Sequence, residues 1–449
     1  MSDTALTERP ASCLREEEAR RLSASWREPP WALQARLDAF HAYCQTPFPP
    51  PSHEWWRRSD VASLPYDTFQ PNGGKAHRPR IGGARRLLRP QREYGALVVQ
   101  ADGLTLRHGI APDLEKTGVV VLPLQEALHK RPSLVQTYLA KAIHPAENRF
   151  TAMAAAFRNG GMLVYLPRNA QVEQPIHLVH ILGRAQGALF PHTLVVAEEG
   201  ASATIVEDYW QEGEGPAFAL PIVELLLEGA TQVRYTGVQA LGAQALFLAL
   251  QRSRILGRDA TLLTYQVHFG SRFVKTILEN HLEGQGSRSD LLGLLFGDGT
   301  QVFDQVTLQD HHSPHTTSDL LYKAALKDRA RSIYYGTVKV RRGAVKTDAF
   351  QTNKNLLLGG RPKADSIPVL EIEADDLRCS HAAAVGPVDE EHLFYLQSRG
   401  ITLPEAQRLL VEGFFDPLAQ RIPAPWLRER IWAWIHRKME ASPSSPVKR

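Results

Sequence analysis

The middle of the chain carries a turn that recurs at nearly constant spacing. Between about residues 160 and 385, short apolar or alternating runs typical of strands are punctuated by Gly, Asp and Asn. At four turns a charged or glycine-containing pair precedes a small residue and a new strand: Glu199-Gly200-Ala201, Glu228-Gly229-Ala230, Arg258-Asp259-Ala260 and Gln285-Gly286-Ser287. The small residues lie 29, 30 and 27 positions apart. This spacing predicts a coiled stack, because each coil climbs one strand spacing of about 4.8 Å and returns to the same edge.

Two further turns agree with this period. Asp328-Arg329-Ala330 and Arg342-Gly343-Ala344 follow after gaps of 43 and 14 residues, close to one and a half periods and to half a period. We therefore expect a mainly β fold with a parallel β-helix core, in which Gly200, Gly229 and Gly286 adopt positive φ at the corners. The alternative on periodicity alone is an ordinary β-sandwich whose turns are evenly spaced by coincidence.

Helical patterns flank the core on both sides. Residues 14–44 predict two short helices interrupted at Pro29-Pro30, and a helical pattern returns at 122–142. After the core, a helix is expected at 390–399, a Thr402-to-Glu405 capping box opens another, and a last one runs over about 425–439. These helices are expected to cap the strand edges that a stack exposes at its ends.

The pattern divides the chain into three expected regions. They are an N-terminal helical region (1–150) with a basic Pro/Gly-rich linker at about 47–92, a parallel β-helix core (151–386) and a C-terminal helical region (387–449). Seven Lys or Arg follow one another between 75 and 92 without an acid. Because no aromatic residues alternate with these charges, a solvated or partner-facing linker is favoured over a nucleic-acid-binding arm.

Charge, cysteine usage and nucleotide motifs exclude several classes of protein. With 52 Lys and Arg against 48 Asp and Glu, the net charge of +4 is too small for a dense phosphate-binding surface, so no nucleic-acid partner is expected. Cys13, Cys44 and Cys379 are far apart and form no CxxC pair, which excludes a disulfide framework and a four-thiolate metal site within this chain. Gly73-Gly74-Lys75 is followed by Ala76, so no ATP site is expected.

The N-terminus and the hydropathy pattern indicate a cytoplasmic protein. The first twenty residues are charged and lack the apolar core of a signal peptide. No stretch approaches 18 uncharged apolar residues, so no membrane association is expected.

The densest cluster of metal-ligand residue types is Asp310-His311-His312-Ser313-Pro314-His315. Imidazoles are good ligands for iron, zinc and copper. The proline places the run in a turn where the three rings need not converge. Histidines that form hydrogen bonds on a turn are therefore the favoured interpretation, and a metal site is the alternative.

A second candidate site is Cys379-Ser380-His381. On a strand, Cys379 and His381 share one face whereas Ser380 points the other way, so the thiol and the imidazole could contact one soft metal. Two ligands do not complete a site, and the alternative is a buried cysteine beside a structural histidine.

The last helix carries an apolar face at helical spacing. Trp426, Ile431 and Trp432 on this terminal helix are candidate partner-binding residues. Packing of the same face on the chain's own core is equally well supported by the pattern.

A set of ordered motifs between about residues 120 and 440 carries a family resemblance. They are Leu122–Ala127, Gly161–Pro167, Gln174–His177, Pro314–Asp319, Tyr322-Lys323, Lys346–Leu358, Ala364–Ile372, Cys379-Ser380-His381 and Glu390–Gly400. Together they resemble the SufB/SufD family of iron–sulfur cluster assembly proteins. The SufD branch carries Cys-Ser-His where SufB carries a Glu-His-Glu type sequence, and this chain is similar to the former. Ala382-Ala383-Ala384 departs from the Gly-Ala-Thr that usually follows.

The resemblance implies a right-handed parallel β-helix in a non-enzymatic scaffold subunit. It implies pairing with SufB and a transient iron–sulfur cluster at the SufB–SufD interface, held by a SufB cysteine and by the histidine that matches His381. It further implies that the C-terminal helices dock the SufC ATPase and that sulfur-delivery proteins act through SufB. Reduced flavin is associated with the whole complex, although this sequence contains no flavin motif. Homodimerisation of the isolated chain is left open.

Two other function classes compete with the scaffold. One is a β-helix enzyme such as a polysaccharide-processing enzyme, since a fold does not determine a function. The other is a stand-alone metal-binding or iron-delivery protein built on the His311–His315 cluster. Neither a six-residue repeat nor a carboxylate-lined groove is indicated by the sequence, so the scaffold is the favoured hypothesis.

Overall fold

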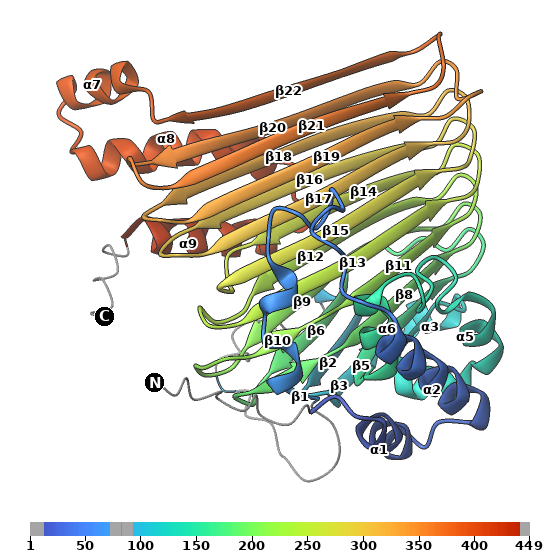
Figure 1. The fold of residues 1–449 in the computed structure, drawn as a ribbon. Coiled ribbons are helices and arrows are strands. Elements are labelled where there is room, and N and C mark those ends of the chain that lie inside the picture. Colours follow the sequence, from blue (N-terminus) through green and yellow to red (C-terminus); the bar gives the residue numbers. More distant parts are fainter. Residues whose placement is uncertain (1–12, 72–81, 83–92, 441–449) are drawn as a thin grey trace, which may run out of the picture.

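The computed structural model describes residues 13–71, 82 and 93–440, and its centre is a β-solenoid of two facing sheets whose strands pair in parallel except for one antiparallel pair at the N-terminal end of each (Figure 1). The basic run expected between 75 and 92 lies outside the described residues. Sheet A contains, in spatial order, β21 (Lys363–Ile372), β19 (Arg331–Val340), β17 (Val302–His311), β15 (Phe273–Leu282), β13 (Leu246–Ile255), β11 (Ile222–Leu227), β8 (Pro191–Ala197), β5 (Gly160–Leu166) and β4 (Val120–Pro123), with β1 (Gln70–Pro71), β7 (Gly187–Leu189) and β10 (Phe218–Ala219) at its side.

Sheet B faces sheet A across the solenoid interior. It contains β22 (Arg378–Pro387), β20 (Asp348–Leu358), β18 (Thr317–Lys327), β16 (Arg288–Gly297), β14 (Thr261–His268), β12 (Gln232–Ala240), β9 (Ser202–Gln211), β6 (Ile176–Leu182), β2 (Ala96–Ala101) and β3 (Leu104–Ile110). From β11 to β22 the chain alternates between the sheets, so each coil adds one strand to each. The mainly β fold and the β-helix core predicted from the turn spacing are confirmed.

Pairing register turns the repeat into rows of stacked side chains. Phe247 of β13 lies opposite Val274 of β15, which lies opposite Phe303 of β17, and all three are buried in the interior. Side chains alternate in direction along a strand, so every second row fills the interior and the others form the outer faces.

One edge of the solenoid is made of corners with a left-handed residue. These residues are spaced 27 to 31 positions apart: Asn169, Gly200, Ala230, Asp259, Gly286, His315 and Lys346. The residue after each is small and buried, as in Ala201, Ser287 and Thr316. Asp328, also left-handed, lies between β18 and β19 on the opposite edge, as the half-period gaps predicted.

The expectation for one corner glycine is wrong. Gly200 and Gly286 have φ of 72° and 71°, but the left-handed position of the intervening coil is Ala230, one residue after Gly229. The corner is shifted by one residue because Thr231, rather than Ala230, turns its side chain into the interior.

N-terminal helices cover the outer face of sheet A near its first coils (Figure 1). They are α1 (Glu16–Trp26), α2 (Pro30–Gln45), α4 (Leu124–Lys130), α5 (Pro132–Tyr138) and α6 (Arg149–Ala156), so the two helices divided at Pro29-Pro30 are confirmed. The short helix α3 (Pro112–Lys116) instead packs through Leu114 on the cluster that contains Val98 and Val172. The buried carboxylate of Glu224 on β11 accepts hydrogen bonds from the backbone N–H groups of Ala140, Ala142 and Ile143, which fixes this cover to the sheet.

C-terminal helices cover the outer face of sheet B. They are α7 (Glu390–Ser398), α8 (Leu403–Ala419) and α9 (Pro425–Glu440), and the predicted Thr402–Glu405 capping box is present. Phe415 of α8 and Ile431 of α9 are buried against an apolar surface that includes Val267 and Leu294 of sheet B. None of the described helices is both long enough and apolar enough to cross a membrane.

At the C-terminal end of the stack, none of the described helices covers the last strands (Figure 1). Most side chains of β21 and β22 are half-buried or exposed, and the apolar Ile372 and Val385 are among the exposed ones. The expectation that flanking helices cap the ends is therefore wrong at this end, because α8 and α9 pack on the side of sheet B instead.

Two corner glycines provide a matched test of this geometry. A Cβ at Gly286 would lie 2.2 Å from Asp259 Oδ1 with φ at +71°, whereas a Cβ at Gly229 would meet nothing closer than 3.4 Å. We expect Gly286→Ala to lower the free energy of unfolding by about 1–2 kcal/mol, the cost of a left-handed alanine. Gly229→Ala should cost clearly less. Equal stability of the two variants in denaturant titrations would contradict the corner assignment.

Candidate functional site

The predicted cysteine–histidine pair lies on the last strand of the solenoid. Cys379 of β22 pairs with Ala349, and His381 pairs with Gln351, in the adjacent strand β20. Both partners are buried and face the interior, so Cys379 and His381 share one face and continue two interior rows. The thiol and the imidazole therefore sit where the next coil of a longer solenoid would cover them.

Cys379 and His381 differ in environment. Cys379 is half-buried against Val338, Val340 and Ala349, and burial raises the pKa of its thiol. His381 is exposed, and none of the residues that the structure describes lies within hydrogen-bonding distance of its ring. The imidazole is thus available to an outside ligand, whereas the thiol is partly enclosed by its own chain.

Free strand edges surround this pair. In the described chain β21 pairs only with β19, and β22 pairs only with β20, so each strand presents one unpaired backbone edge. Exposed Phe350, Ile372 and Val385 lie on β20, β21 and β22. A long, partly apolar open edge is a template for pairing with another chain.

The histidine run at 311–315 does not bring three rings together. His311 points into the interior, where its ring nitrogens contact the hydroxyls of Thr316 and Ser318, and burial lowers its pKa to about 4. His315 occupies an exposed left-handed corner. Only His312 is placed with other metal-ligand side chains.

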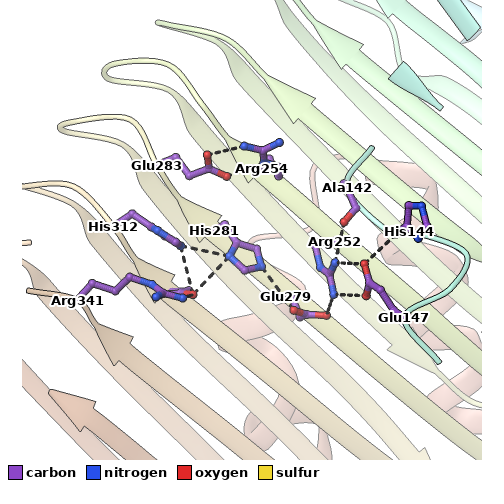
Figure 2. A network of polar contacts seen from close by, with 11 residues as sticks. Ala142, His144, Glu147, Arg252, Arg254, Glu279, His281, Glu283, His312 and Arg341 are labelled. Atoms are coloured by element: carbon purple, nitrogen blue, oxygen red, sulfur yellow. Dashed lines mark hydrogen bonds and ion pairs between the residues drawn. The ribbon is translucent and has the colours of Figure 1, made fainter. Parts of the chain in front are cut away.

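His312 meets two residues from neighbouring strands on the outer face of sheet A. His281 of β15 pairs in register with Asp310 of β17, and His312 follows directly after that strand. Figure 2 shows the imidazoles of His281 and His312 side by side. The Asp310 carboxylate lies 3.4 Å from His281 Nδ1 and 3.2 Å from His312 Nε2. Sequence reasoning missed His281, although its distance of 29 residues from Asp310 equals one coil and was the available signal.

A network of opposite charges surrounds this cluster (Figure 2). Arg341 donates hydrogen bonds to both carboxylate oxygens of Asp310, at 2.9 and 2.8 Å. Burial raises the pKa of Asp310, but hydrogen bonds from His281, His312 and Arg341 outweigh it and hold that pKa well below its usual range. Burial likewise lowers the pKa of His281, but contacts with Asp310 and Glu279 outweigh it and raise that pKa to about 9.

The apolar residues predicted to bind a partner are largely used within the chain. Ile431 is buried against sheet B, and the half-buried Trp426 packs on Tyr94 and His177. Trp432 is half-buried and stacks on His436. Of the three, the two tryptophans keep partial exposure on α9, and partner binding there stays a prediction.

A different apolar surface on the C-terminal helices is open. Helix α7 has no buried residue, and Phe394 and Tyr395 are 75% and 57% exposed. Leu403 and Leu409 of α8 are exposed as well. Sequence periodicity did not single out these residues, because helix α7 lacks a one-sided apolar face.

Comparisons with known proteins identify the same family as the sequence motifs. The family model "SUF system FeS cluster assembly, SufBD core domain" matches residues 180–414, and "SufBD protein N-terminal region" matches residues 97–178. The chain is 29% identical to the iron-sulfur cluster assembly protein SufD of Bacillus subtilis, over 95% of this chain and 98% of that protein. It is 26% identical to an iron-sulfur cluster assembly SufBD family protein of Staphylococcus haemolyticus, over 93% and 91% of the two chains. The chain therefore belongs to the SufB/SufD family of iron–sulfur cluster assembly proteins.

Proposed function

We propose that this chain is a non-catalytic, SufD-like scaffold subunit that pairs with SufB and helps to hold a nascent iron–sulfur cluster at their interface. The observation that carries the proposal is the open C-terminal end of the solenoid, where His381 stands on an exposed strand beside Cys379. The free edges of β21 and β22 can pair with strands of a second solenoid, because their unpaired backbone N–H and C=O groups can form hydrogen bonds with another strand.

The cluster requires ligands from both chains. Iron–sulfur clusters are held mainly by thiolates, supplemented at some sites by histidine. One imidazole with one half-buried thiol does not complete such a set, so a cysteine of SufB supplies the remainder. The iron–sulfur cluster is then cargo that is shared across the interface and passed on.

The other partners are proposed to bind away from the open end of the solenoid. The C-terminal helices, with exposed Phe394 and Tyr395 on α7, are the proposed dock for the SufC ATPase. Sulfur-delivery proteins act through SufB, and reduced flavin belongs to the whole complex. A second copy of this chain could cover the same open end when SufB is absent, which makes the homodimer an outcome to be measured in the isolated protein.

Charged substitutions at the open end should weaken pairing with SufB. We expect the double variant Ile372→Asp, Val385→Asp to lower the affinity for SufB at least about tenfold, because it places charge on a dry edge-to-edge contact. Leu106→Asp is the matched control, since Leu106 is an exposed apolar residue on β3, the last strand of sheet B at its opposite end. Co-purification and titration with SufB give the readout, and unchanged binding in the double variant would contradict the proposed interface.

Removal of the imidazole should stop cluster assembly without breaking the complex. We expect His381→Ala to reduce the iron and sulfide content and the visible absorbance of the anaerobically isolated three-protein complex by at least about tenfold. Cys379→Ala should act more mildly, since the thiol packs on its own chain. Ser380→Ala is the control, because that side chain points to the other face. Full cluster content in His381→Ala would refute a ligand role, and loss of SufB binding would assign the ring to packing instead.

Point substitutions test the SufC dock better than truncation does. Removal of residues 401–449 would strip the buried cover from sheet B, so loss of stability could not be told apart from loss of the dock. We expect Phe394→Ser, Tyr395→Ser to weaken SufC binding by about tenfold or more, because exposed aromatic anchors dominate interfaces. Trp432→Ala tests the surface predicted from the sequence. If only Trp432→Ala loses SufC binding, the dock lies on α9 instead of α7.

A further inference from the structure

Three ligand atoms on the outer face of sheet A form a nearly equilateral triangle. His281 Nδ1 lies 3.4 Å from Asp310 Oδ2, His312 Nε2 lies 3.2 Å from the same oxygen, and the two nitrogens are 3.3 Å apart. His281 comes from one coil, and Asp310 and His312 come from the next. Figure 2 shows the two imidazoles next to each other.

This triangle matches the spacing of ligands around a small metal ion. Nitrogen and carboxylate ligands lie at about 2.0–2.1 Å from zinc, so two ligands at tetrahedral angles are about 3.3–3.4 Å apart. An ion above the centre of the triangle would reach all three atoms without movement of the backbone. We propose that His281, Asp310 and His312 form a binding site for a divalent transition-metal ion of the zinc or ferrous class.

Neighbouring side chains are placed as supports for such a site. The second ring nitrogen of His281, Nε2, faces Glu279 Oε2 at 3.5 Å, so Nδ1 is the nitrogen left for the ion. A carboxylate behind a ligating histidine is the usual second layer of metal sites, where it orients the ring and raises its basicity. Glu279 is itself held by Arg252 at 2.6 Å.

The carboxylate ligand is held in a fixed position. Asp310 is buried, and Arg341 donates hydrogen bonds to both of its carboxylate oxygens. An ionised carboxylate offers about four lone pairs, so Oδ2 can bind an ion while Oδ1 keeps its hydrogen bond from Arg341. The backbone N–H of His312 donates to the carbonyl of Leu282 at 3.0 Å, which fixes the start of the turn that carries the third ligand.

The donor set selects the class of ion. Two imidazoles and one carboxylate suit zinc and ferrous iron, whereas magnesium and calcium prefer oxygen ligands throughout. The side chain of His312 is 31% exposed, which leaves a path and an open coordination position to solvent. Three protein ligands with an open fourth position are typical of ions that exchange or react, while structural zinc sites are closed by four.

The site is separate from the proposed cluster-assembly end. His281 and Asp310 lie on β15 and β17 and face outward, whereas His381 lies on β22 of the other sheet and continues an interior row. The proposal therefore goes beyond the scaffold function and does not depend on it. Substitution of one site leaves the residues of the other in place.

Metal titration of the full-length chain tests the proposal. Apo protein is titrated with Zn²⁺ and Co²⁺, and with Fe²⁺ under anaerobic conditions, at mildly alkaline pH and with Mg²⁺ in excess. We expect the wild type to bind one equivalent at this site, with the intense visible bands of four-coordinate Co²⁺. His281→Ala and His312→Ala should each lower the affinity more than a hundredfold, since even an outer support such as Glu279 is worth about 10–100-fold.

The control variant removes an imidazole from the same turn. His315→Asn keeps a residue that tolerates the left-handed corner and should bind the ion as the wild type does. His312→Asn replaces His312→Ala should the latter fail to fold. Equal binding by wild type and His312 variants, effective competition by Mg²⁺, or no bound equivalent in the wild type would each overturn the proposal.

Discussion

Parallel backbone pairing between successive coils is the constraint on which the rest of the structure depends. Each strand must find its hydrogen-bond partners in the coil before and the coil after, so the chain must return to the same edge after a nearly constant number of residues. The left-handed corners at 27 to 31 residue intervals meet this requirement. A residue's place in its coil therefore determines whether it faces the interior, an outer sheet face or a corner.

The outer faces of the two sheets show how the stack joins its terminal helices. Sheet A carries the buried carboxylate of Glu224, which binds backbone N–H groups ahead of α6, and sheet B carries the buried Asp208, which pairs with Arg430 of α9 at 2.5 Å. Buried charges of this kind are costly unless paired, so each pair favours the observed position of its helices over positions that would leave the charge unpaired. Apolar residues such as Phe415 and Ile431 provide the area of contact.

The same stacking brings chemistry together from distant positions. His281 and Asp310 are neighbours because they occupy one position in consecutive coils, and His312 joins them because the strand ends there. At the last coil the effect is reversed: His381 occupies an interior row, and it is exposed because β22 has no further strand beside it in the part of the chain that the structure describes. An interior position on the last described coil of a solenoid is thus left open to solvent.

The sequence by itself determined the β-helix, its flanking helices, the common face of Cys379 and His381 and the family, because these depend on local turn chemistry, periodicity and ordered motifs. The sequence also contained the 29-residue offset between His281 and Asp310. Periodicity places a residue in its coil only to within one position, however, as the shift of the corner from Gly229 to Ala230 shows. Only the tertiary structure decided that Ile431 packs on sheet B, that α7 stays exposed and that the C-terminal end is open. Apolar helix faces look alike in sequence whether they meet their own chain or a partner, since burial depends on which surfaces the whole fold brings into contact.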